Sequence, residues 1–251
     1  MGRNSQFYVN CTWNEISNLD RRNTIILLPA GSIEQHGPHL PLDTDSLTAG
    51  FIAQKLAEMT GEFKVVVAPT LRYTYAKPSR VFPGTLSVDG ETLIRLARDI
   101  LRGFLKQGFE KILVLNAHME NTDFLIEGIA LALEGSTSAK TILVNWWEMV
   151  GEPDLIKIFG PDWKGWVDEH AALVETSLML FIAPELVKTN QIVDGRRQSQ
   201  LEFRILPWDI KNFPDSGVFS AVQGAHPEKG QRLLELILNE LTGMINTQFK
   251  I

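Results

Sequence analysis

Short runs of apolar residues alternate along this chain with longer segments in which apolar residues recur every three or four positions. The short runs have the length and composition of buried strands, and they predict strands at residues 24–28, 64–68, 111–115 and 141–145. The longer segments have helical spacing and predict helices at residues 46–59, 88–107, 122–134, 171–181 and 227–247. Since strands that alternate with helices usually pair in the same direction, the pattern predicts an α/β fold around a mostly parallel sheet.

Three features add detail to this pattern. Ser46 is expected to cap the helix at 46–59, and Gly108 is expected to end the helix at 88–107 with a positive φ. Residues 187–220 contain several prolines and little periodicity. We therefore expect this segment to form an excursion at the edge of the fold or a contact between subunits.

Side chains that can hold a metal ion follow the predicted strands. Glu34 and His36 come after the first strand, and His118 and Glu120 come after the third. Each pair is spaced two residues apart, so on an extended segment both side chains would point to the same side. Because the loops that follow parallel strands leave from one edge of the sheet, we expect the two pairs to meet there with Asp45. A mixed set of imidazoles and carboxylates is typical of a hydrolytic site with two divalent ions.

Several of these residues also have a simpler interpretation. An isolated Glu-x-His pair such as Glu34 and His36 more often lies on the surface without a ligand. Asp43 is better explained by the start of a helix, and His39 by a structural contact. Glu175 lies among apolar helix residues, so its carboxylate needs a salt bridge, a metal ion or a ligating histidine that it orients. We favour the last of these.

Composition excludes several classes of protein. The chain has 251 residues, of which 44% are hydrophobic, and this suits a single domain over residues 1–251. Its 30 acidic and 24 basic residues give a net charge of -6 without a basic stripe, so nucleic acid is not an expected partner. The single cysteine excludes an internal disulfide and a thiolate-rich zinc site.

The absence of certain sequence motifs disfavours further classes of protein. The sequence has no signal-peptide pattern and no apolar run long enough to cross a membrane, so we expect a cytoplasmic protein without a membrane partner. A serine hydrolase is disfavoured because there is no Gly-x-Ser-x-Gly elbow. A nucleotide enzyme is disfavoured because neither glycine-rich phosphate loop occurs.

Four stretches of the sequence match a known family. They are LPAGSIEQHGPHLPLDTD from Leu28 to Asp45, FPGTLS from Phe82 to Ser87, Asn116-Ala117-His118 with Asn121, and ETSLML from Glu175 to Leu180. Together they resemble the signature of the creatininase (creatinine amidohydrolase) family. The resemblance implies a three-layer α/β/α sandwich with a central mostly parallel sheet, assembly into hexamers, and two divalent ions per subunit, zinc or manganese. It also implies hydrolysis of C–N bonds in cyclic or linear amides.

The resemblance also assigns roles to individual residues. It implies metal binding by Glu34, His36, Asp45, His118 and Glu120, with Asp45 as the bridge between the ions. It implies substrate contacts from Met119, Trp147, Trp166 and His170, whereas we expect Trp146 and Trp163 to pack in the core. For catalysis we expect Glu120 to shuttle a proton and His170, with an ordinary imidazole pKa near 6.5, to donate one to the leaving nitrogen.

The sequence is compatible with several classes of substrate. Glu120 and the tryptophans favour a small cyclic amide, most of all the hydrolysis of creatinine to creatine. The same chemistry on a linear formamide or a peptide-like amide is the nearest alternative. Lys77 and Arg80, if they line the pocket, would favour an anionic lactam instead. Ala117 and Met119 depart from the residues usual in creatininase. A sugar-binding or isomerase-like protein that holds one ion is a third possibility, and the number of ions per chain distinguishes it.

Overall fold

A parallel four-stranded sheet lies at the centre of the molecule. The computed structural model describes residues 6–59, 61–136, 138–161, 163–195 and 213–250. The strands are β1 (Thr24–Ala30), β2 (Lys64–Val67), β3 (Lys111–Asn116) and β4 (Lys140–Asn145), in the order β2-β1-β3-β4. All three neighbouring pairs are parallel, with Ile26 opposite Ile112 and Asn116 opposite Asn145. The predicted parallel α/β fold is confirmed.

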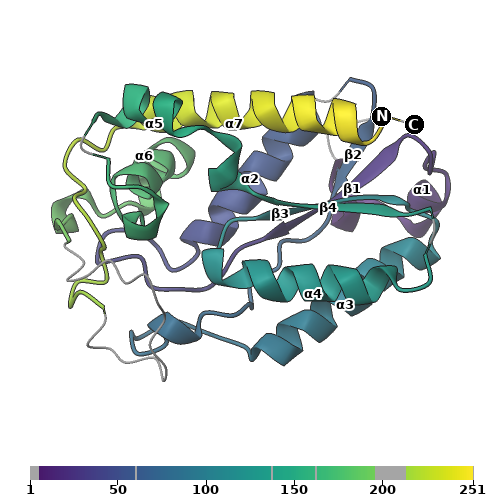
Figure 1. Cartoon of the computed structure of the whole chain (residues 1–251), viewed down its shortest axis with the longest axis horizontal. Helices are drawn as coiled ribbons and strands as arrows, with labels where there is room; N and C mark the ends of the chain where they lie inside the picture. The colour runs from purple at the N-terminus through teal and green to yellow at the C-terminus, as the bar shows by residue number, and fades with distance from the viewer. Residues whose placement is uncertain (1–5, 60, 137, 162, 196–212, 251) are drawn as a thin grey trace.

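Helices cover both faces of this sheet and complete the three-layer sandwich (Figure 1). One face packs against α3 (Gly90–Lys106) and α4 (Thr122–Leu133). The opposite face packs against α2 (Thr44–Met59), α6 (Leu173–Ile182) and α7 (Pro227–Gln248). Alternate residues of β1 serve the two cores, since Ile26 and Leu28 face α3 and α4 whereas Ile25 and Leu27 face α2 and α7. A strand buried on both faces has to be apolar throughout, which explains the continuous apolar runs in the sequence.

The ends of the elements differ from the predictions by a few residues. Gly108 has φ +84°, as expected for the residue that follows α3. Ser46 does not precede its helix, because α2 begins at Thr44 and the Ser46 hydroxyl donates to the carbonyl of Ser32 instead. Asp45 therefore lies in the first turn of α2, where the helix dipole stabilises its negative charge. Two short helices, α1 (Trp13–Ser17) and α5 (Glu152–Phe159), were not predicted.

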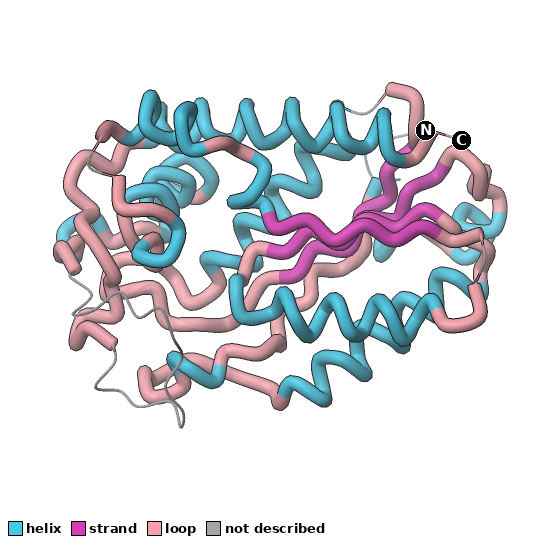
Figure 2. The backbone as a smooth tube through the Cα atoms, viewed as in Figure 1, coloured by secondary structure: helices cyan, strands magenta, loops and turns pink. Residues whose placement is uncertain are grey.

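The loops that leave the carboxyl ends of the strands gather at one end of the molecule, as Figure 2 shows. The loop after β1 is pressed against α2, because a Cβ on Gly31 would lie 2.4 Å from the Cα of Ser46. The chain after β3 enters the 3-10 helix η4 (Met119–Asn121), and the chain after β4 enters η5 (Trp146–Met149). Residues from distant parts of the sequence thus meet at this end. Among the described residues, no helix combines the length and apolar content that a membrane crossing requires.

Candidate active site

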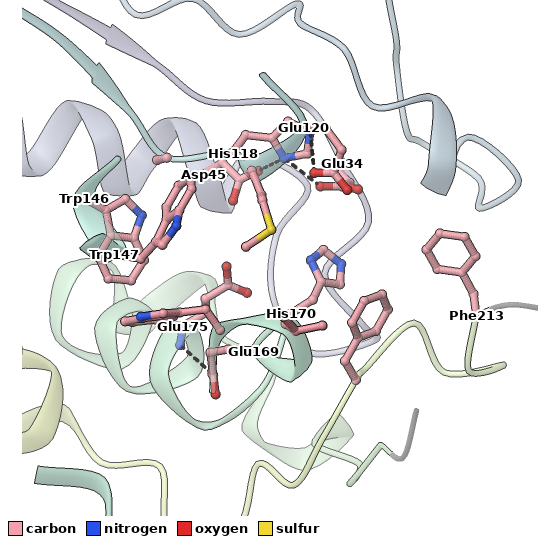
Figure 3. A pocket seen from close by; sticks show the side chains of 15 residues that line it. Glu34, Asp45, His118, Glu120, Trp146, Trp147, Glu169, His170, Glu175 and Phe213 are labelled. Carbon is pink, nitrogen blue, oxygen red and sulfur yellow. Dashed lines mark hydrogen bonds and ion pairs between the residues drawn. The ribbon is translucent and has the colours of Figure 1, made fainter. Parts of the chain in front are cut away.

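A pocket opens at the end of the sheet where these loops gather (Figure 3). Of the predicted site residues, only His36 does not line the pocket, and it is buried at 1% exposure in contact with the lining residue Asp45. The lining residues are Glu34, Asp45, Ala117, His118, Met119, Glu120, Trp146, Trp147, Trp166, Val167, Glu169, His170, Glu175, Phe213 and Phe219. The fold therefore brings together residues that are more than a hundred positions apart.

His118 and two carboxylates form the first group of possible metal ligands. The Nδ1 atom of His118 lies 3.1 Å from Oε2 of Glu34 and 3.0 Å from Oδ2 of Asp45. Its Nε2 atom lies 2.9 Å from the carbonyl of Tyr75, which fits a neutral ring that donates from Nε2. In that tautomer Nδ1 presents its lone pair to the space between the two carboxylates. A cation between these three atoms would satisfy all of them, whereas without an ion the same contacts are those of a protonated His118 with two carboxylates.

His36 belongs to a second group on the other side of Asp45. Its Nδ1 lies 3.1 Å from the carbonyl of Glu34, so this nitrogen can carry the proton. Its Nε2 is buried and makes no hydrogen bond with the described residues. That atom lies 3.0 Å from Oδ1 of Asp45 and 3.7 Å from Oε2 of Glu175. A buried nitrogen directed at two carboxylates again fits a bound cation.

Asp45 is common to both groups, because its two oxygens face different histidines. In the described part of the chain, three sets of side chains bring their ligand atoms within 4.8 Å of one another. They are Glu34, Asp45 and His118; His36, Asp45 and Glu175; and Glu34, His36 and His170. Glu120 belongs to none of them, and its Oε2 lies 3.3 Å from Nε2 of His118.

The carboxylates make this part of the pocket favourable for positive charge. Burial opposes a charge on His36, but Asp45 and Glu175 outweigh it and raise the pKa of His36 to about 10. Burial also opposes a charge on His118, yet Glu34 and Glu120 raise its pKa well above the ordinary value. Burial alone would raise the pKa of Glu34, but His118 lowers it to about 2. A site that holds protonated imidazoles this firmly also attracts divalent ions.

On the opposite wall of the pocket, the surroundings disfavour the charged forms of three side chains. Burial raises the pKa of Glu169 to about 8, and the neighbouring Glu175 carboxylate adds to this shift. Burial likewise raises the pKa of Glu175 to about 7. The pKa of His170 is lowered to about 4 by burial and by His36. Our expectation of an ordinary imidazole pKa for His170 is therefore wrong, because this partly buried ring lies beside a second histidine, with the ring centroids 4.5 Å apart.

Gln35 and the segment after residue 212 hold His170 in place. The side-chain Oε1 of Gln35 accepts from the N–H of Gly37 at 2.9 Å, and Nε2 donates to the carbonyl of Gly217 at 3.1 Å. The same Nε2 lies 2.8 Å from Nε2 of His170. On the other side, the N–H of Phe219 donates to the His170 carbonyl, and the two rings lie 4.9 Å apart.

The described part of residues 187–220 thus forms a wall of the pocket, through Phe213 and Phe219. We had expected an edge excursion or a subunit contact, and the wall was missed because this segment has no periodicity. Residues 196–212 lie outside the described residues.

Tryptophans form another wall. Trp147 and Trp166 line the pocket as expected. Trp146, which we expected only in the core, belongs to the core cluster and also lines the pocket, with its ring 5.4 Å from that of Trp166. Trp163 packs 5.2 Å behind Trp166 and does not line the pocket.

His118 is extended, with φ −133° and ψ 118°, but the chain after it is not, contrary to the sequence-based expectation. Residues 119–121 form η4, so Glu120 turns away from the direction of His118 Nδ1 and Met119 is 48% exposed at the pocket. Side-chain amides fix this turn, since Asn116 donates to the carbonyl of His118 and Asn121 donates to that of Gly31. These amides satisfy buried carbonyls that a strand would have paired.

Two serines hold the carboxylates, and neither was among the predicted site residues. The hydroxyl of Ser32 donates to Oδ2 of Asp45 at 2.6 Å. The hydroxyl of Ser79 donates to Oε1 of Glu34. Both serines are fully buried, so these bonds fix the direction of the two carboxylates.

Four other residues lie outside the pocket. His39 contacts the Thr176 hydroxyl at 2.9 Å, a structural contact as we expected. Asp43 directly precedes α2, where its carbonyl accepts from the N–H of Leu47, and its carboxylate forms an ion pair with Arg72 at 2.7 Å that we did not predict. Lys77 forms an ion pair with Asp89. Lys77 and Arg80 line a separate surface cleft together with Asp89. Lys77 and Arg80 therefore do not favour an anionic substrate.

Comparison with known proteins agrees with this geometry. The profile described as "Creatininase: Creatinine amidohydrolase" matches residues 9–245. The chain is 32% identical to creatinine amidohydrolase from Pseudomonas putida, over 98% of each chain. The chain belongs to the creatininase family. It is therefore a hydrolase that acts on C–N amide bonds.

Other relatives in this family differ in substrate. The chain is 30% identical to the mycofactocin precursor peptide peptidase of Mycolicibacterium smegmatis, over 86% of this chain and 81% of the relative. A mutant creatininase complexed with creatine superposes with a TM-score of 0.91 at 31% identity, over 98% of this chain and all of the other. Solved creatininases also include a Zn-Zn type and a Mn form. The family thus fixes the reaction class more firmly than the substrate.

Proposed function

We propose that this protein is an amidohydrolase with two divalent metal ions that cleaves the C–N bond of a small cyclic amide, with creatinine as the first candidate. The observation that supports this most is the shared position of Asp45, which faces His118 with one oxygen and His36 with the other. Two ligand groups that share a carboxylate are typical of paired metal sites. The adjoining wall of Trp147 and Trp166 suits a flat, delocalised ring.

The imidazole and carboxylate atoms of these groups fit zinc or manganese. Glu34, Asp45 and His118 would hold one ion, and His36 and Asp45 would hold the other. When bound, the ions supply a nucleophilic water at neutral pH and positive charge beside the amide oxygen. Imidazole and carboxylate sets accept several divalent metals, so the donor chemistry leaves zinc and manganese as equal candidates.

The remaining pocket residues position the substrate and move protons. Trp147, Trp166 and Met119 would hold the ring and exclude water from it. In the hydrolysis, the hydroxyl part of a water joins the carbonyl carbon, the ring C–N bond breaks, and the nitrogen gains a proton. Glu120 lines the pocket and would accept the proton of the water. His170 also lines it, and its lowered pKa means that the ring would first take up a proton before it donates one to the nitrogen.

Hydrolysis of a peptide-like or formamide substrate is the second candidate. One relative is a precursor peptide peptidase, at 30% identity, and the pocket is open to solvent at Met119 and Val167, which are 48% and 57% exposed. A longer substrate could enter over these two residues. The tryptophan wall and the partly buried His170 favour the small ring instead.

A substrate screen with parallel metal analysis tests the proposal. Protein loaded with Mn²⁺ or Zn²⁺ is assayed against creatinine, other lactams, formamides and short peptides, and its metal content is measured by mass spectrometry. We expect two ions per chain and turnover of creatinine. Turnover of another amide with two bound ions would change the substrate, whereas one ion or none per chain would overturn the dinuclear mechanism.

We also propose a hexameric assembly and a cytoplasmic location, both by analogy with the family. Light scattering coupled to size-exclusion chromatography would measure the mass of the assembly. A mass that matches one chain of 28.2 kDa would overturn the hexamer. Fractionation of cells that express the protein would test its location.

A further inference from the structure

Four tryptophans contact one another in a row beside the pocket. Trp147 meets Trp146 with ring centroids 6.2 Å apart, and Trp146 meets Trp166 at 5.4 Å. Trp163 ends the row at 5.2 Å from Trp166, and it is the one member that does not line the pocket. The ring planes meet at 87°, 83° and 77°, so every contact is edge to face. Figure 3 shows Trp146 and Trp147 at one side of the pocket, across from Phe213.

The rings of this row differ in how the backbone supports them. Trp146 and Trp147 directly follow β4, and they are 3% and 8% exposed. Trp166 is half-buried and lies in η6 (Trp166–Asp168), a 3-10 helix of three residues. A helix this short has few backbone hydrogen bonds, and their geometry is poorer than in an α-helix. Trp166 therefore needs support from its neighbours.

The chain before Trp166 gives the ring little support. Gly165 has φ +87°, and a Cβ added there would have no atom within 4 Å. Lys164 is exposed, and neither of these two residues belongs to a helix or a strand. The position of the Trp166 ring is therefore set by the side chains that it contacts rather than by its own backbone.

Trp163 supports Trp166 from a side that Trp146 does not reach. Both rings contact Trp166, but in the described part of the chain they make no ring contact with each other. Trp163 also packs against the main hydrophobic core, so it connects Trp166 to the folded body of the protein. An edge-to-face pair of aromatic rings shifts an equilibrium by roughly 2- to 10-fold beyond the effect of its buried area.

We propose that Trp163 is a positioning residue for substrate binding, which holds the Trp166 ring against the pocket without touching the substrate. The inference rests on the proposed function, in which Trp166 contacts the ring of a small cyclic amide. Without Trp163 the Trp166 ring takes several positions, and only a fraction of the molecules present it correctly. Apparent affinity falls by that fraction, whereas the chemical step on bound substrate is unchanged.

Steady-state kinetics with the best amide substrate tests the proposal. In Trp163→Leu, KM should rise about 5-fold while kcat stays within about twofold, which is the pattern of lost uniform binding. Trp163→Phe keeps an aromatic ring and should raise KM by only about twofold. Trp13→Leu is the matched control, because Trp13 is 78% exposed and lies outside the pocket. Its KM should equal that of wild type.

A double variant shows whether Trp163 acts through Trp166. Trp163→Leu combined with Trp166→Leu should have the same KM as Trp166→Leu alone, since contacting residues are not additive when one acts only through the other. A residue that merely stabilises the fold would lower Tm and leave KM unchanged. A KM in the double variant clearly above that of Trp166→Leu would overturn the inference.

A second measurement does not depend on activity. The protein is labelled with fluorotryptophan, and the fluorine NMR resonance of Trp166 is assigned from its loss in Trp166→Leu. In Trp163→Leu this resonance should shift and broaden, because the ring takes several positions, and the Trp13 resonance should not change. Trp163→Phe serves for the same comparison if the leucine variant does not fold.

The two measurements separate failure of the inference from failure of the function. An unchanged Trp166 resonance, or an unchanged KM in a folded Trp163→Leu protein, would overturn the role of Trp163 and leave the amidohydrolase function standing. A wild-type protein that turns over none of the amides would overturn the proposed function instead. The fluorine resonances would then decide by themselves whether Trp163 positions Trp166.

Discussion

Replacement of Gly217 by alanine should disable His170 without removing metal. Gly217 has φ +71°, and a Cβ there would lie 2.0 Å from Oε1 of Gln35. Ordinary contact begins at 3.4 Å, so the two groups would have to separate by about 1.4 Å. The Gln35 amide cannot simply turn aside, because it is held by Gly37, by the Gly217 carbonyl and by His170.

The expected magnitudes follow from these contacts. A left-handed alanine costs about 1–2 kcal/mol, and the lost Gln35 to Gly217 hydrogen bond costs about 1 kcal/mol more. We therefore expect the free energy of unfolding to fall by about 2–3 kcal/mol. A displacement of about 1 Å near the chemistry can lower a rate roughly 100-fold, so turnover of the best amide substrate should fall by about that factor.

Three measurements decide the outcome. Unfolding in urea gives the stability, steady-state kinetics gives kcat, and metal analysis gives the number of ions, which should stay as in wild type. Gly243→Ala is the control, because this exposed glycine of α7 has no atom within 4 Å of its added Cβ. It should gain about 0.4–1 kcal/mol and keep its activity. A Gly217→Ala protein that folds and retains full kcat would refute the view that Gln35 and Gly217 position His170.

Three further predictions concern the ions and the aromatic wall. Ser32→Ala removes the hydroxyl that donates to Asp45 at 2.6 Å and should weaken metal binding about 10- to 100-fold, which a Mn²⁺ titration would measure. Trp147→Ala should raise KM for a ring substrate about 5-fold, since a face contact with a delocalised cation contributes about 1 kcal/mol, and unchanged KM would remove this tryptophan from the binding site. A chelator should abolish turnover and lower Tm, because ions that bind only the folded chain stabilise it, and added Mn²⁺ or Zn²⁺ should restore both.

The sequence predicted the elements better than their ends. Periodicity found all four strands and the long helices because both faces of the sheet and one face of each helix are buried. It missed α5 and placed the start of α2 two residues late. Helix ends depend on local contacts such as that of Ser46 with the Ser32 carbonyl, and no periodic pattern records such a contact.

For the candidate site, too, the sequence predicted some features and missed others. Glu34, His36, Asp45 and His118 could be placed from the sequence, since parallel strands deliver their loops to one edge and the family motif names these residues. Their metal-binding role stays a prediction. The sequence did not reveal the turn at η4 that moves Glu120 away from the ligand group.

Contacts between residues that are far apart in the sequence could not be predicted either. Phe219 reaches His170, and Ser79 reaches Glu34, only because the folded chain brings these pairs together. The ion pair of Lys77 with Asp89 also could not be predicted, and because of it Lys77 no longer favours an anionic substrate. The sequence around each of these residues does not indicate which residue it contacts.

The walls of the pocket and its hydrolytic centre come from largely separate parts of the chain. Most of the candidate metal ligands come from the loops after β1 and β3 and from α2, with His170 and Glu175 added from the chain at α6. The walls come from η5, from Trp166 and from the segment with Phe213 and Phe219. Mutations in the later half of the gene can therefore reshape substrate preference while the reactive machinery is inherited intact. This separation marks the tryptophan and phenylalanine walls as the positions to randomise when a new amide is the target.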